Sequence, residues 1–521
     1  MIRRFRYIVL IFVLIYMVRL FGINLFLFGD EVEWVKGIES PSLETAIFFI
    51  PHPPVPMLIY RSFHFIGFSG ESLRIVPFIF TGLTIILLFF LCRKLYGERS
   101  ARICVLLLLL SFYSLLMSLQ IDSDAILVFF LVCALFFYTH ENKFLLGLFF
   151  GFLLLSKITM VLVLASFFIA DWFVSKSFWT AVKRNVYPFS IAAAMVSLFF
   201  ALSYLLNPDW FRLLFSHPAL LDWNPLPWYA PLFFLFIFAT PLLLTPLLKN
   251  FVFIEKKEYV FYTLILIFFS VHIFLIRQGD FSRYFMILIP PLVLLCAKSL
   301  SSLVLNRISF YITVVLGFLC FIFLNYLPMD FPLHTTKAYS AMITSGTFSF
   351  FYSYGISSGS WFVVNFLSIV VIIIAFMLSV FIFIFFPKST FFPLIMAFFI
   401  SFNLFVAGEY LFHFSQPNPS EVANEMKEHL EGRTLNYPII VSNKGFLYYF
   451  DQYHKVLDNQ SYPLYAENID IINREIEEQG GTILINYFAL NVDPLNLNLT
   501  SCYLEKEFFS RRKKMGEIYT C

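Results

Sequence analysis

Long apolar runs recur from the N-terminus to about residue 408, and they limit the fold more than any other feature of the chain. A helix needs about 20 apolar residues to cross a bilayer, because every backbone amide must be hydrogen-bonded within the helix there. The segments that reach or approach this length lie near residues 7–28, 76–92, 101–119, 124–139, 143–156, 158–174, 187–205, 229–247, 258–276, 284–304, 309–326, 361–386 and 391–408. The sequence therefore predicts an all-α membrane protein with about thirteen transmembrane helices.

The composition excludes a soluble protein. Only 13% of the 521 residues are charged and 60% are hydrophobic, whereas a soluble domain carries about 25% charged residues. Apolar surface in such excess must face lipid. The net charge of +3 comes without a basic face, which excludes nucleic acid as a partner and leaves the lipid bilayer.

The positions of Lys and Arg predict the orientation, because cytoplasmic loops are enriched in both residues. Arg3, Arg4 and Arg6 precede the first span, and Arg93 and Lys94 follow the second. This bias places the N-terminus in the cytoplasm. An odd number of spans then places the C-terminal segment outside it. We expect a multi-pass protein of the cell (plasma) membrane.

The character of the sequence changes at about residue 410, where polar residues become frequent. The expected domains are a transmembrane domain, residues 1–409, and an extracytoplasmic domain, residues 410–521. Helix-like and strand-like segments alternate in the second, which predicts a small α/β domain. The helices are expected at 421–430 and 469–479, and the strands at 437–441 and 482–486.

Two of the seven cysteines lie in this polar segment, and the others are scattered through apolar runs. Cys502 and Cys521 would form a disulfide in an oxidising compartment outside the cytoplasm. The sequence leaves this pairing open. The segment also holds Asn498-Leu499-Thr500, which fits the N-glycosylation acceptor pattern.

The first outer loop, residues 29–77, is long and polar. Asp30, Glu31 and Glu33 follow the first span directly, at a helix C-terminus whose dipole does not favour negative charge. We therefore expect these carboxylates to have a function rather than to cap the helix. Further along, residues 57–68 predict an amphipathic helix on the membrane surface, which either anchors the loop or contacts substrate.

Later outer loops carry both acidic and basic residues. Asp122 and Asp124 lie between two tight spans, where Asp124 either caps the following helix or contributes to a site. Lys157 lies in an outer turn, where its ammonium either reaches lipid headgroups or binds a phosphate. Arg283 and Tyr284 lie at the outer end of a later span, and the planar fork of Arg suits phosphate.

One charge lies deeper in the membrane. Arg19 falls inside the first apolar run, where an unpaired charge is costly and usually faces a polar cavity. The outer loops therefore combine carboxylates, which accept protons, with cations, which hold a phosphate leaving group. This combination at lipid depth favours glycosyl transfer from a membrane-embedded polyprenyl-phosphate sugar.

A series of short motifs runs through roughly the first 300 residues. It comprises Gly29-Asp30-Glu31, His52-Pro53-Pro54, residues 71–77, residues 96–99, residues 124–130, residues 147–157, Ser282-Arg283-Tyr284 and Pro290-Pro291. In order, spacing and outer-face placement, these motifs resemble those of the integral-membrane glycosyltransferases of the GT-C fold. The resemblance is to the group that contains the protein O-mannosyltransferases and the lipid-A aminoarabinose transferase.

The resemblance implies a role for each matching residue. Asp30 would be the general base or would orient the acceptor, with Glu31 assisting and Asp124 supporting the same cavity. The residues that would bind the donor phosphate are Lys157, Arg283, Tyr284 and His52. The residues that would support the site are Arg74, Asp122 and Arg19.

Two positions depart from the pattern of that group. Asp122 stands where an Arg is common, two residues before the acidic position of the second motif, and His52 replaces the commoner Lys. Both changes make the cavity less basic. Asp122 beside Asp124 also leaves a divalent cation open, because hard cations favour carboxylate oxygens.

The sequence thus predicts an inverting glycosyltransferase, with an outer-loop Asp as base. It would move a hexosyl or pentosyl unit from a polyprenyl-phosphate-linked donor to a protein, lipid or glycan acceptor outside the cytoplasm. A membrane transporter and a lipid-linked-glycan ligase or polymerase are the alternatives. Transporters carry charged or discontinuous helices near the bilayer midplane, whereas the polar residues here gather at one face. The sugar, the acceptor and the carrier lipid remain open.

Overall fold

The computed structural model describes residues 2–25, 27, 30–49, 53–209, 243, 254–271, 285–301, 353–357, 360–365, 419–431, 439–441, 461–463, 469–486, 497–510 and 513–521, with isolated positions between 311 and 412. The chain divides into two compact units. The first comprises Met1–Ile23, Gly37–Leu324 and Val371–Ala407, and the second comprises Asn24–Lys36, Asn325–Val370 and Gly408–Cys521.

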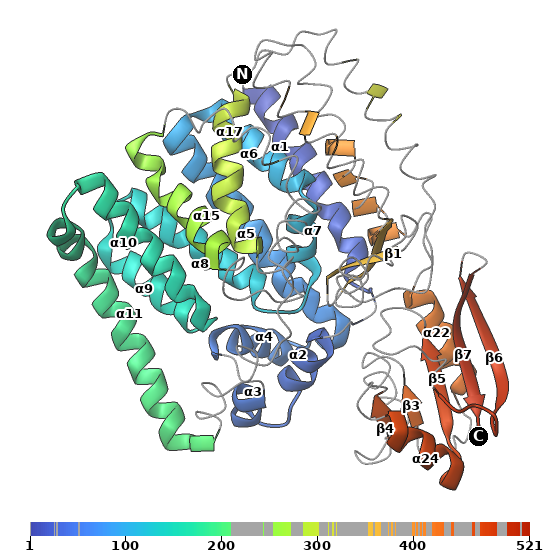
Figure 1. Ribbon diagram of the computed structural model, residues 1–521. Helices are drawn as coiled ribbons and strands as arrows, with labels where there is room; N and C mark the ends of the chain where they lie inside the picture. The colour runs from blue at the N-terminus through green and yellow to red at the C-terminus, as the bar shows by residue number, and fades with distance from the viewer. Residues whose placement is uncertain are drawn as a thin grey trace. The chain divides into compact units, whose positions relative to one another are not determined.

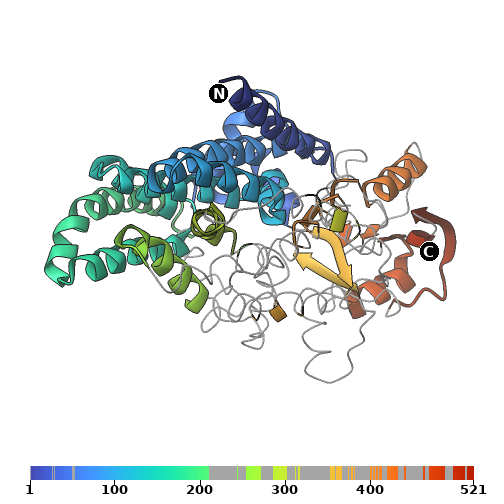
Figure 2. The same cartoon turned by 90° about the horizontal axis from the view of Figure 1, so that it is seen from above.

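The first unit is a bundle of helices, coloured blue to yellow-green in Figure 1. Seen from above, the blue and green helices lie side by side (Figure 2). The described helices are α1 (Ile2–Met17), η1 (Val18–Gly22), α3 (Leu43–Phe49), α4 (Val55–Phe65), η2 (Gly70–Arg74), α5 (Ile75–Tyr96), α6 (Glu98–Leu110), α7 (Phe112–Leu119), α8 (Asp124–Thr139), α9 (Lys143–Leu154), η3 (Ile158–Met160), α10 (Val161–Ser175), α11 (Phe178–Leu206), η5 (Lys256–Glu258), α15 (Tyr259–Val271), η7 (Phe285–Leu288) and α17 (Ile289–Ser301).

Three helices in the described residues are long and apolar enough to cross a membrane. They are Gly70–Tyr96, Ile158–Ser175 and Phe178–Leu206, and the bent pair of α6 and α7 makes a fourth if it counts as one span. The expected segments at 229–247, 309–326 and 391–408 lie wholly or largely outside the described residues. The total of about thirteen spans therefore stays a prediction.

Polar turns set the ends of the short apolar helices. α8 covers residues 124–139, as the apolar run predicts. After a tight turn α9 begins at Lys143, because Oδ1 of Asn142 accepts a hydrogen bond from the Leu145 amide at 3.1 Å. This side chain satisfies one of the amides that a helix N-terminus leaves free.

α9 packs closely against α11, because α9 carries glycine where the helices meet. A Cβ atom on Gly147 would lie 2.8 Å from the carbonyl oxygen of Pro188. On Gly151 it would lie 2.4 Å from the sulfur of Met195. Small residues allow the backbones of membrane helices to approach. The glycines of the motif at 147–157 therefore serve helix packing.

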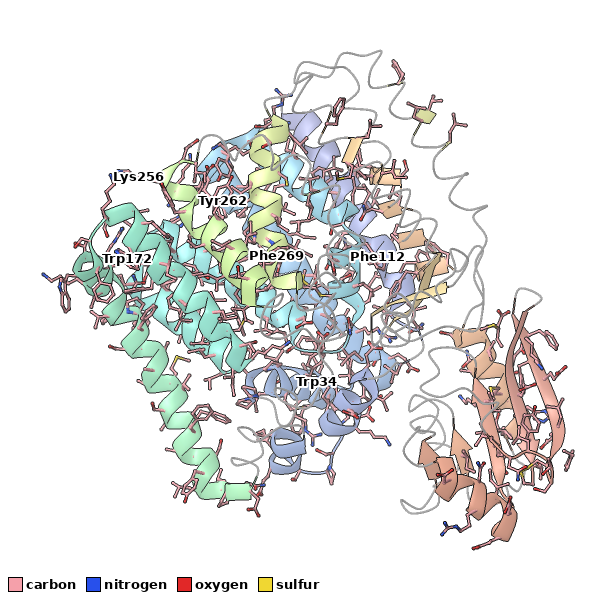
Figure 3. The ribbon with its side chains drawn as sticks, in the orientation of Figure 1. Trp34, Phe112, Trp172, Lys256, Tyr262 and Phe269 are labelled. Atoms are coloured by element: carbon pink, nitrogen blue, oxygen red, sulfur yellow. A yellow bond between two sulfur atoms is a disulfide. The ribbon has the colours of Figure 1, made fainter. Side chains whose placement is uncertain are left out.

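The expected span at 101–119 is not one straight helix. It breaks at Ser111 into α6 and α7, which meet at a bend of 65°. Oδ1 of Asn403 accepts a hydrogen bond from the amide of Phe112, the first residue of α7, at 3.2 Å. Phe112 is 1% exposed and lies within the helices of the first unit (Figure 3).

Arg19 donates hydrogen bonds to carbonyl oxygens on both sides of the break at Ser111. Its Nη2 donates to the carbonyl oxygens of Leu108 and Leu109, both at 3.2 Å, at the end of α6. Its Nη1 donates to the carbonyl oxygen and the hydroxyl of Ser114 in α7, at 2.7 and 3.1 Å. The guanidinium therefore holds the bend by binding carbonyl groups that a helix C-terminus leaves free.

A buried ionic cluster joins the ends of α5, α15 and α17 that the charge bias predicts to be cytoplasmic. Glu258 is fully buried and accepts hydrogen bonds from Tyr96 at 3.0 Å and from Lys298 at 2.5 Å. Lys298 and Lys257 also donate to Glu255, and these hydrogen bonds lower the pKa of that carboxyl. The cluster ties three helices together at one end of the bundle.

The second unit contains a five-stranded mixed sheet. The strands are β3 (Ile439–Val441), β4 (Ser461–Pro463), β5 (Thr482–Asn486), β6 (Tyr503–Ser510) and β7 (Lys513–Thr520), in the order β4-β3-β5-β7-β6. The pairs β3–β4 and β3–β5 are parallel, and β5–β7 and β6–β7 are antiparallel. The helices α22 (Pro419–Leu430) and α24 (Ile469–Gln479) alternate with the strands. A core of Ile440, Ile476, Ile483, Ile485 and Leu497 joins α24 to the sheet.

A two-stranded hairpin corrects one expected span. β1 (Ser353–Ser357) pairs antiparallel with β2 (Ser360–Asn365). The expectation of a helix from residue 361 is therefore wrong for the first residues of that segment. Val363 and Val364 are β-branched, which suits a strand as well as an apolar span.

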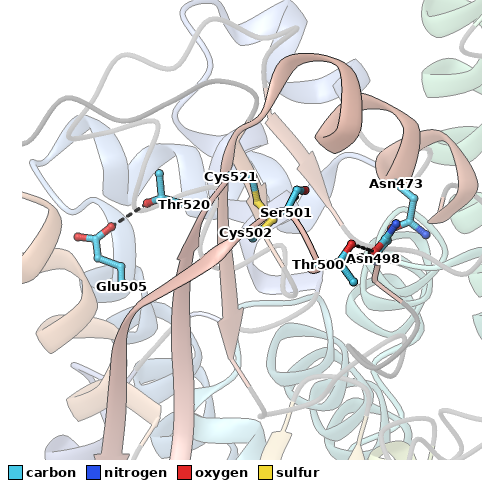
Figure 4. The surroundings of a disulfide bond; sticks show 8 residues. All are labelled: Asn473, Asn498, Thr500, Ser501, Cys502, Glu505, Thr520 and Cys521. Carbon is cyan, nitrogen blue, oxygen red and sulfur yellow. Dashed lines mark hydrogen bonds between the residues drawn. A yellow bond between two sulfur atoms is a disulfide. The ribbon is translucent and has the colours of Figure 1, made fainter.

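A disulfide joins Cys502, just before β6, to Cys521, just after β7 (Figure 4). The Cys521 amide also donates to the Gly481 carbonyl at 2.9 Å, which fixes the chain terminus beside β5. Close by, Oδ1 of Asn498 accepts a hydrogen bond from the Thr500 hydroxyl at 2.7 Å (Figure 4). The structure therefore contains the disulfide that the sequence left open.

Candidate active site

The acidic loop between α7 and α8 is folded tightly inside the bundle. Asp122 is 4% exposed and Asp124 is 6% exposed. Oδ1 of Asp122 accepts a hydrogen bond from the Asp124 amide at 2.7 Å, at the first residue of α8. The side chain of Asp122, which precedes the N-cap residue Ser123, therefore satisfies the first free amide of this helix, and the carboxylate of Asp124 is available for another role.

Lys157 provides a cation beside that carboxylate. It follows α9 in an extended conformation, and its Nζ lies 3.5 Å from Oδ1 of Asp124. Both side chains are largely buried, 16% and 8% exposed. Oδ2 of Asp124 is buried and accepts no hydrogen bond within the described part of the chain. The pair therefore places an ammonium and a carboxylate side by side inside the bundle.

Tyr60 of α4 holds the acidic loop from the other side. It is fully buried, and its hydroxyl donates to the Asp122 carbonyl oxygen at 3.0 Å and accepts from the Asp122 amide at 3.2 Å. The Val55 amide at the start of α4 donates to the Leu155 carbonyl oxygen at 3.1 Å. α4 thus contacts both loops that carry the Asp124–Lys157 pair.

The amphipathic helix expected at 57–68 is α4, which spans Val55–Phe65. Its buried face carries Met57, Tyr60 and Arg61, whereas Phe65 is 76% exposed. Sequence reasoning missed the role of Tyr60, because its partner is a backbone rather than another side chain. A tyrosine on the inner face of an otherwise apolar helix was the available signal, since a buried hydroxyl usually finds a hydrogen-bond partner.

The supporting arginines contact backbone groups elsewhere in the first unit. Arg19 holds the bend between α6 and α7. Arg74 is 1% exposed, and its Nη1 donates to the Ile23 carbonyl oxygen at 3.1 Å, after the end of η1. Arg61 donates to the Ile38 carbonyl oxygen, and its guanidinium lies over the ring of Phe65.

The carboxylates after the first span begin a separate helix, α2 (Asp30–Ile38). The expectation that they lie at the C-terminus of span one is therefore wrong. A helix N-terminus favours negative charge, so the dipole gives no reason to assign them a function. Glu31 is 4% exposed, whereas Glu33 is exposed.

Four expected site positions lie outside the described residues. They are the side chain of Asp30 and the whole of His52, Arg283 and Tyr284. Their convergence with Asp124 and Lys157 stays a prediction. As to a cation site, no group of three or more His, Cys, Asp or Glu side chains with metal-binding geometry occurs in the described ranges.

The structure thus brings together three of the ten predicted site residues, Asp122, Asp124 and Lys157, at the loop ends of one helix bundle. The carboxylate can accept a proton or a hydrogen bond, and the ammonium can bind an anion. Such a pair suits the binding of a substrate with a phosphate and a hydroxyl.

Comparisons with known proteins bear on this arrangement. Residues 51–205 match the family model of dolichyl-phosphate-mannose-protein mannosyltransferase. This stretch runs from before α4 to near the end of α11, and it contains Asp124 and Lys157. A search of curated protein sequences found no match.

Two solved structures are similar over almost the whole chain. The apo crystal structure of ArnT from Cupriavidus metallidurans matches with a TM-score of 0.64 at 14% identity, over 99% of this chain and 97% of that chain. The crystal structure of the same protein bound to undecaprenyl phosphate matches with a TM-score of 0.61 at 13% identity, over the same shares. The chain therefore has the GT-C fold of the ArnT and protein-mannosyltransferase type of membrane glycosyltransferase, as its sequence motifs predict.

Proposed function

We propose that this chain transfers a sugar from a polyprenyl-phosphate carrier to a protein, lipid or glycan acceptor on the extracytoplasmic face of the cell membrane. The observation that carries the proposal is the buried Asp124–Lys157 pair at the loop ends of the helix bundle. The fold supports it, because the similar ArnT was solved with undecaprenyl phosphate bound. The donor would be a sugar on a lipid of that chemical class.

The reaction would proceed by one displacement with inversion. The acceptor oxygen or nitrogen attacks the anomeric carbon of the sugar, and the bond from that carbon to the phosphate oxygen breaks. The proton of the acceptor goes to a carboxylate, for which Asp30 is the candidate base and Glu31 its assistant. The electron pair of the broken bond stays on the polyprenyl phosphate, which leaves as an anion.

Cations would stabilise the leaving phosphate. Lys157 would bind it directly, with Arg283, Tyr284 and His52 as further candidates. Asp124 holds the Lys157 ammonium at 3.5 Å, and a buried ammonium without such a partner would be costly. We therefore assign Asp124 to the placement of Lys157 rather than to proton transfer.

The remaining predicted residues would support the site. Asp122 folds the acidic loop, Arg19 fixes the bend before that loop, and Arg74 joins η2 to the end of η1. A buried arginine that already holds a bend is not available to a transported solute, which disfavours a transporter. A ligase or polymerase would use the same carrier with a longer glycan.

The proposed topology has a cytoplasmic N-terminus, transmembrane residues 1–409 and an extracytoplasmic domain at 410–521. The disulfide Cys502–Cys521 supports the outer location of that domain, because the cytosol keeps thiols reduced. Glycosyl transfer on the outer face would then use a donor that is already across the membrane.

The test is sugar release from a polyprenyl-phosphate donor by the full chain in proteoliposomes, with the freed polyprenyl phosphate measured. The Asp30→Asn variant should lose at least about 100-fold in turnover, because a general base contributes about 10²–10⁴-fold. Glu33→Gln, a change of an exposed carboxylate in the same helix, is the matched control.

Each alternative has its own outcome. Uptake of a solute without sugar release would assign the chain to transport. Turnover only with an oligosaccharide donor would assign it to the ligases or polymerases. Wild-type turnover in Asp30→Asn would remove Asp30 from the mechanism.

A further inference from the structure

A groove opens between α10 and α11, and neither Asp124 nor Lys157 is among its lining residues. Its volume is about 480 Å³, within the range of roughly 300–1,000 Å³ of small-molecule sites. The residues that line it are Phe168, Phe178, Val182, Asn185, Val186, Phe189, Ser190 and Ala193. Most of this wall is aliphatic or aromatic, which suits a hydrocarbon chain.

Within the described residues, two cations without an ion-pair partner lie toward the end of this groove that is nearer the α10–α11 turn. Lys176 lies in that turn, and Lys183 follows the lining residue Val182 in the first part of α11. Both lysines are exposed, and neither side chain forms a hydrogen bond or ion pair within the described part of the chain. They are free to bind an anion.

The neighbouring Arg184 is already engaged. Its Nη1 lies 3.1 Å from Oδ1 of Asp171, a buried carboxylate that also accepts hydrogen bonds from Tyr138 and Asn185. This polar cluster fixes α11 against α8 and α10 at the same end of the groove. The positive charge left at the groove end therefore comes from Lys176 and Lys183.

Aromatic residues mark a membrane interface at this end. Trp172 is 46% exposed and Trp179 is 71% exposed, on either side of the turn. Trp172 lies toward the end of α10, at the side of the bundle (Figure 3). Exposed Trp beside Lys is typical of the level of lipid headgroups, and the charge bias predicts this end to be cytoplasmic.

We propose that an anionic phospholipid binds in this groove, with an acyl chain against α11 and its phosphate at Lys176 and Lys183. Basic sites between transmembrane helices on the cytoplasmic side bind such headgroups. The ligand is not the sugar donor, because Lys157 and Lys176 lie at opposite ends of α10. That helix has 15 residues, a length of roughly 22 Å at 1.5 Å per residue.

The test uses the full chain in nanodiscs with lipids brominated on their acyl chains, which quench tryptophan fluorescence on contact. Brominated phosphatidylglycerol should quench Trp172 and Trp179 at a lower mole fraction than brominated phosphatidylcholine. The preference should be about fivefold for each lysine. A Trp172→Phe/Trp179→Phe variant gives the fluorescence of the remaining tryptophans, which is subtracted as background.

Three further variants separate headgroup from chain. Lys176→Gln/Lys183→Gln should make the two lipids bind equally, whereas Lys143→Gln, a change at the exposed first residue of α9, should keep the preference. Ala193→Phe should fill the groove and weaken quenching by both lipids. Equal quenching in the wild type, an equal loss in Lys143→Gln or unchanged quenching in Ala193→Phe would each overturn the proposal. The assay measures lipid binding and not sugar transfer, so a failure of this proposal can be told apart from a failure of the proposed glycosyltransferase function.

Discussion

The hydroxyl of Tyr60 binds both backbone groups of Asp122, the carbonyl oxygen at 3.0 Å and the amide at 3.2 Å. One side chain from α4 thus satisfies backbone groups of a buried residue in the loop between α7 and α8. Such a bridge lets α4 set the position of Asp124 and, through the ion pair, of Lys157.

Tyr60→Phe should therefore impair both stability and transfer. The variant removes the Tyr60 donor from the Asp122 carbonyl oxygen and leaves the Asp122 N–H only its hydrogen bond to the Gln120 carbonyl oxygen at 3.1 Å, and losing a buried hydrogen-bond partner costs about 1–3 kcal/mol. Thermal unfolding in detergent measures that loss, and kcat/KM for the lipid-phosphate donor should fall by about tenfold or more. Tyr187→Phe, a change at an exposed tyrosine of α11, is the control.

A role in placement is separated from general instability by a second variant. If Tyr60 acts through Lys157, the double variant Tyr60→Phe/Lys157→Gln should lose less activity than the product of the two single losses. If the activity loss of the double variant equals the product of the two single losses, Tyr60 only stabilises the fold.

The ion pair predicts different kinetics for its two members. Lys157→Gln should raise the donor KM by about 10- to 100-fold, because a hydrogen bond to a charged group contributes about 1.5–3 kcal/mol. Asp124→Asn should raise it less, since the ammonium remains and loses only the negative charge of Asp124 at 3.5 Å. Steady-state kinetics at varied donor concentration measure both values.

Lys143→Gln serves as the control for the loss of one positive charge, and its KM should equal that of the wild type. A normal donor KM in Lys157→Gln would exclude this lysine from phosphate binding.

Arg19 should matter for stability more than any exposed arginine. Arg19→Met removes the donors for the Leu108 and Leu109 carbonyl groups inside the bundle, with an expected loss of at least about 2 kcal/mol. Arg93→Met removes an arginine whose side chain is 58% exposed and paired with Glu98, and should cost about 0–1 kcal/mol. Unfolding by increasing SDS measures the free energy of unfolding of both variants. Equal values would refute the role of Arg19 in stabilising the bend between α6 and α7.

The disulfide predicts a redox-dependent second unit. Cys502 and Cys521 are separated by 19 positions, and a loop of about this size gives roughly 3 kcal/mol on a chain-entropy estimate. Cys502→Ser/Cys521→Ser should therefore speed hydrogen exchange of the β5 and β7 amides. Wild-type protein treated with reductant should behave like the variant. Exchange that does not respond to reductant would show that the crosslink contributes nothing.

Elements whose ends carry local signals were predictable from the sequence. Residues 124–139 become α8 and residues 482–486 become β5, because each apolar run is bounded by polar or glycine residues. The helix at 469–479 is α24 with the same bounds. In these segments, periodicity and turn chemistry agree with the tertiary structure.

Features that depend on distant partners were not predictable. The break at Ser111 lies in an apolar run without Pro or Gly, and its stabilising partners, Arg19 and Asn403, come from remote parts of the chain. The strand β2 lies at the start of an apolar run that is also typical of a span.

The candidate site shows the same division. The Asp124–Lys157 pair was predictable because both residues occupy loops on the same expected face of the membrane. The hydrogen bond from Tyr60 was not, because any residue offers a backbone carbonyl and amide and no pattern marks the one that is used.

The two glycines of α9 do not restrict their positions equally. A methyl group at 151 would meet the end of the flexible Met195 side chain, which can rotate away, whereas at 147 it would meet the backbone of Pro188. Only a shift of α11 as a whole could relieve the second clash. The missing side-chain carbon at residue 147 therefore sets how closely the neighbouring helices α9 and α11 can approach.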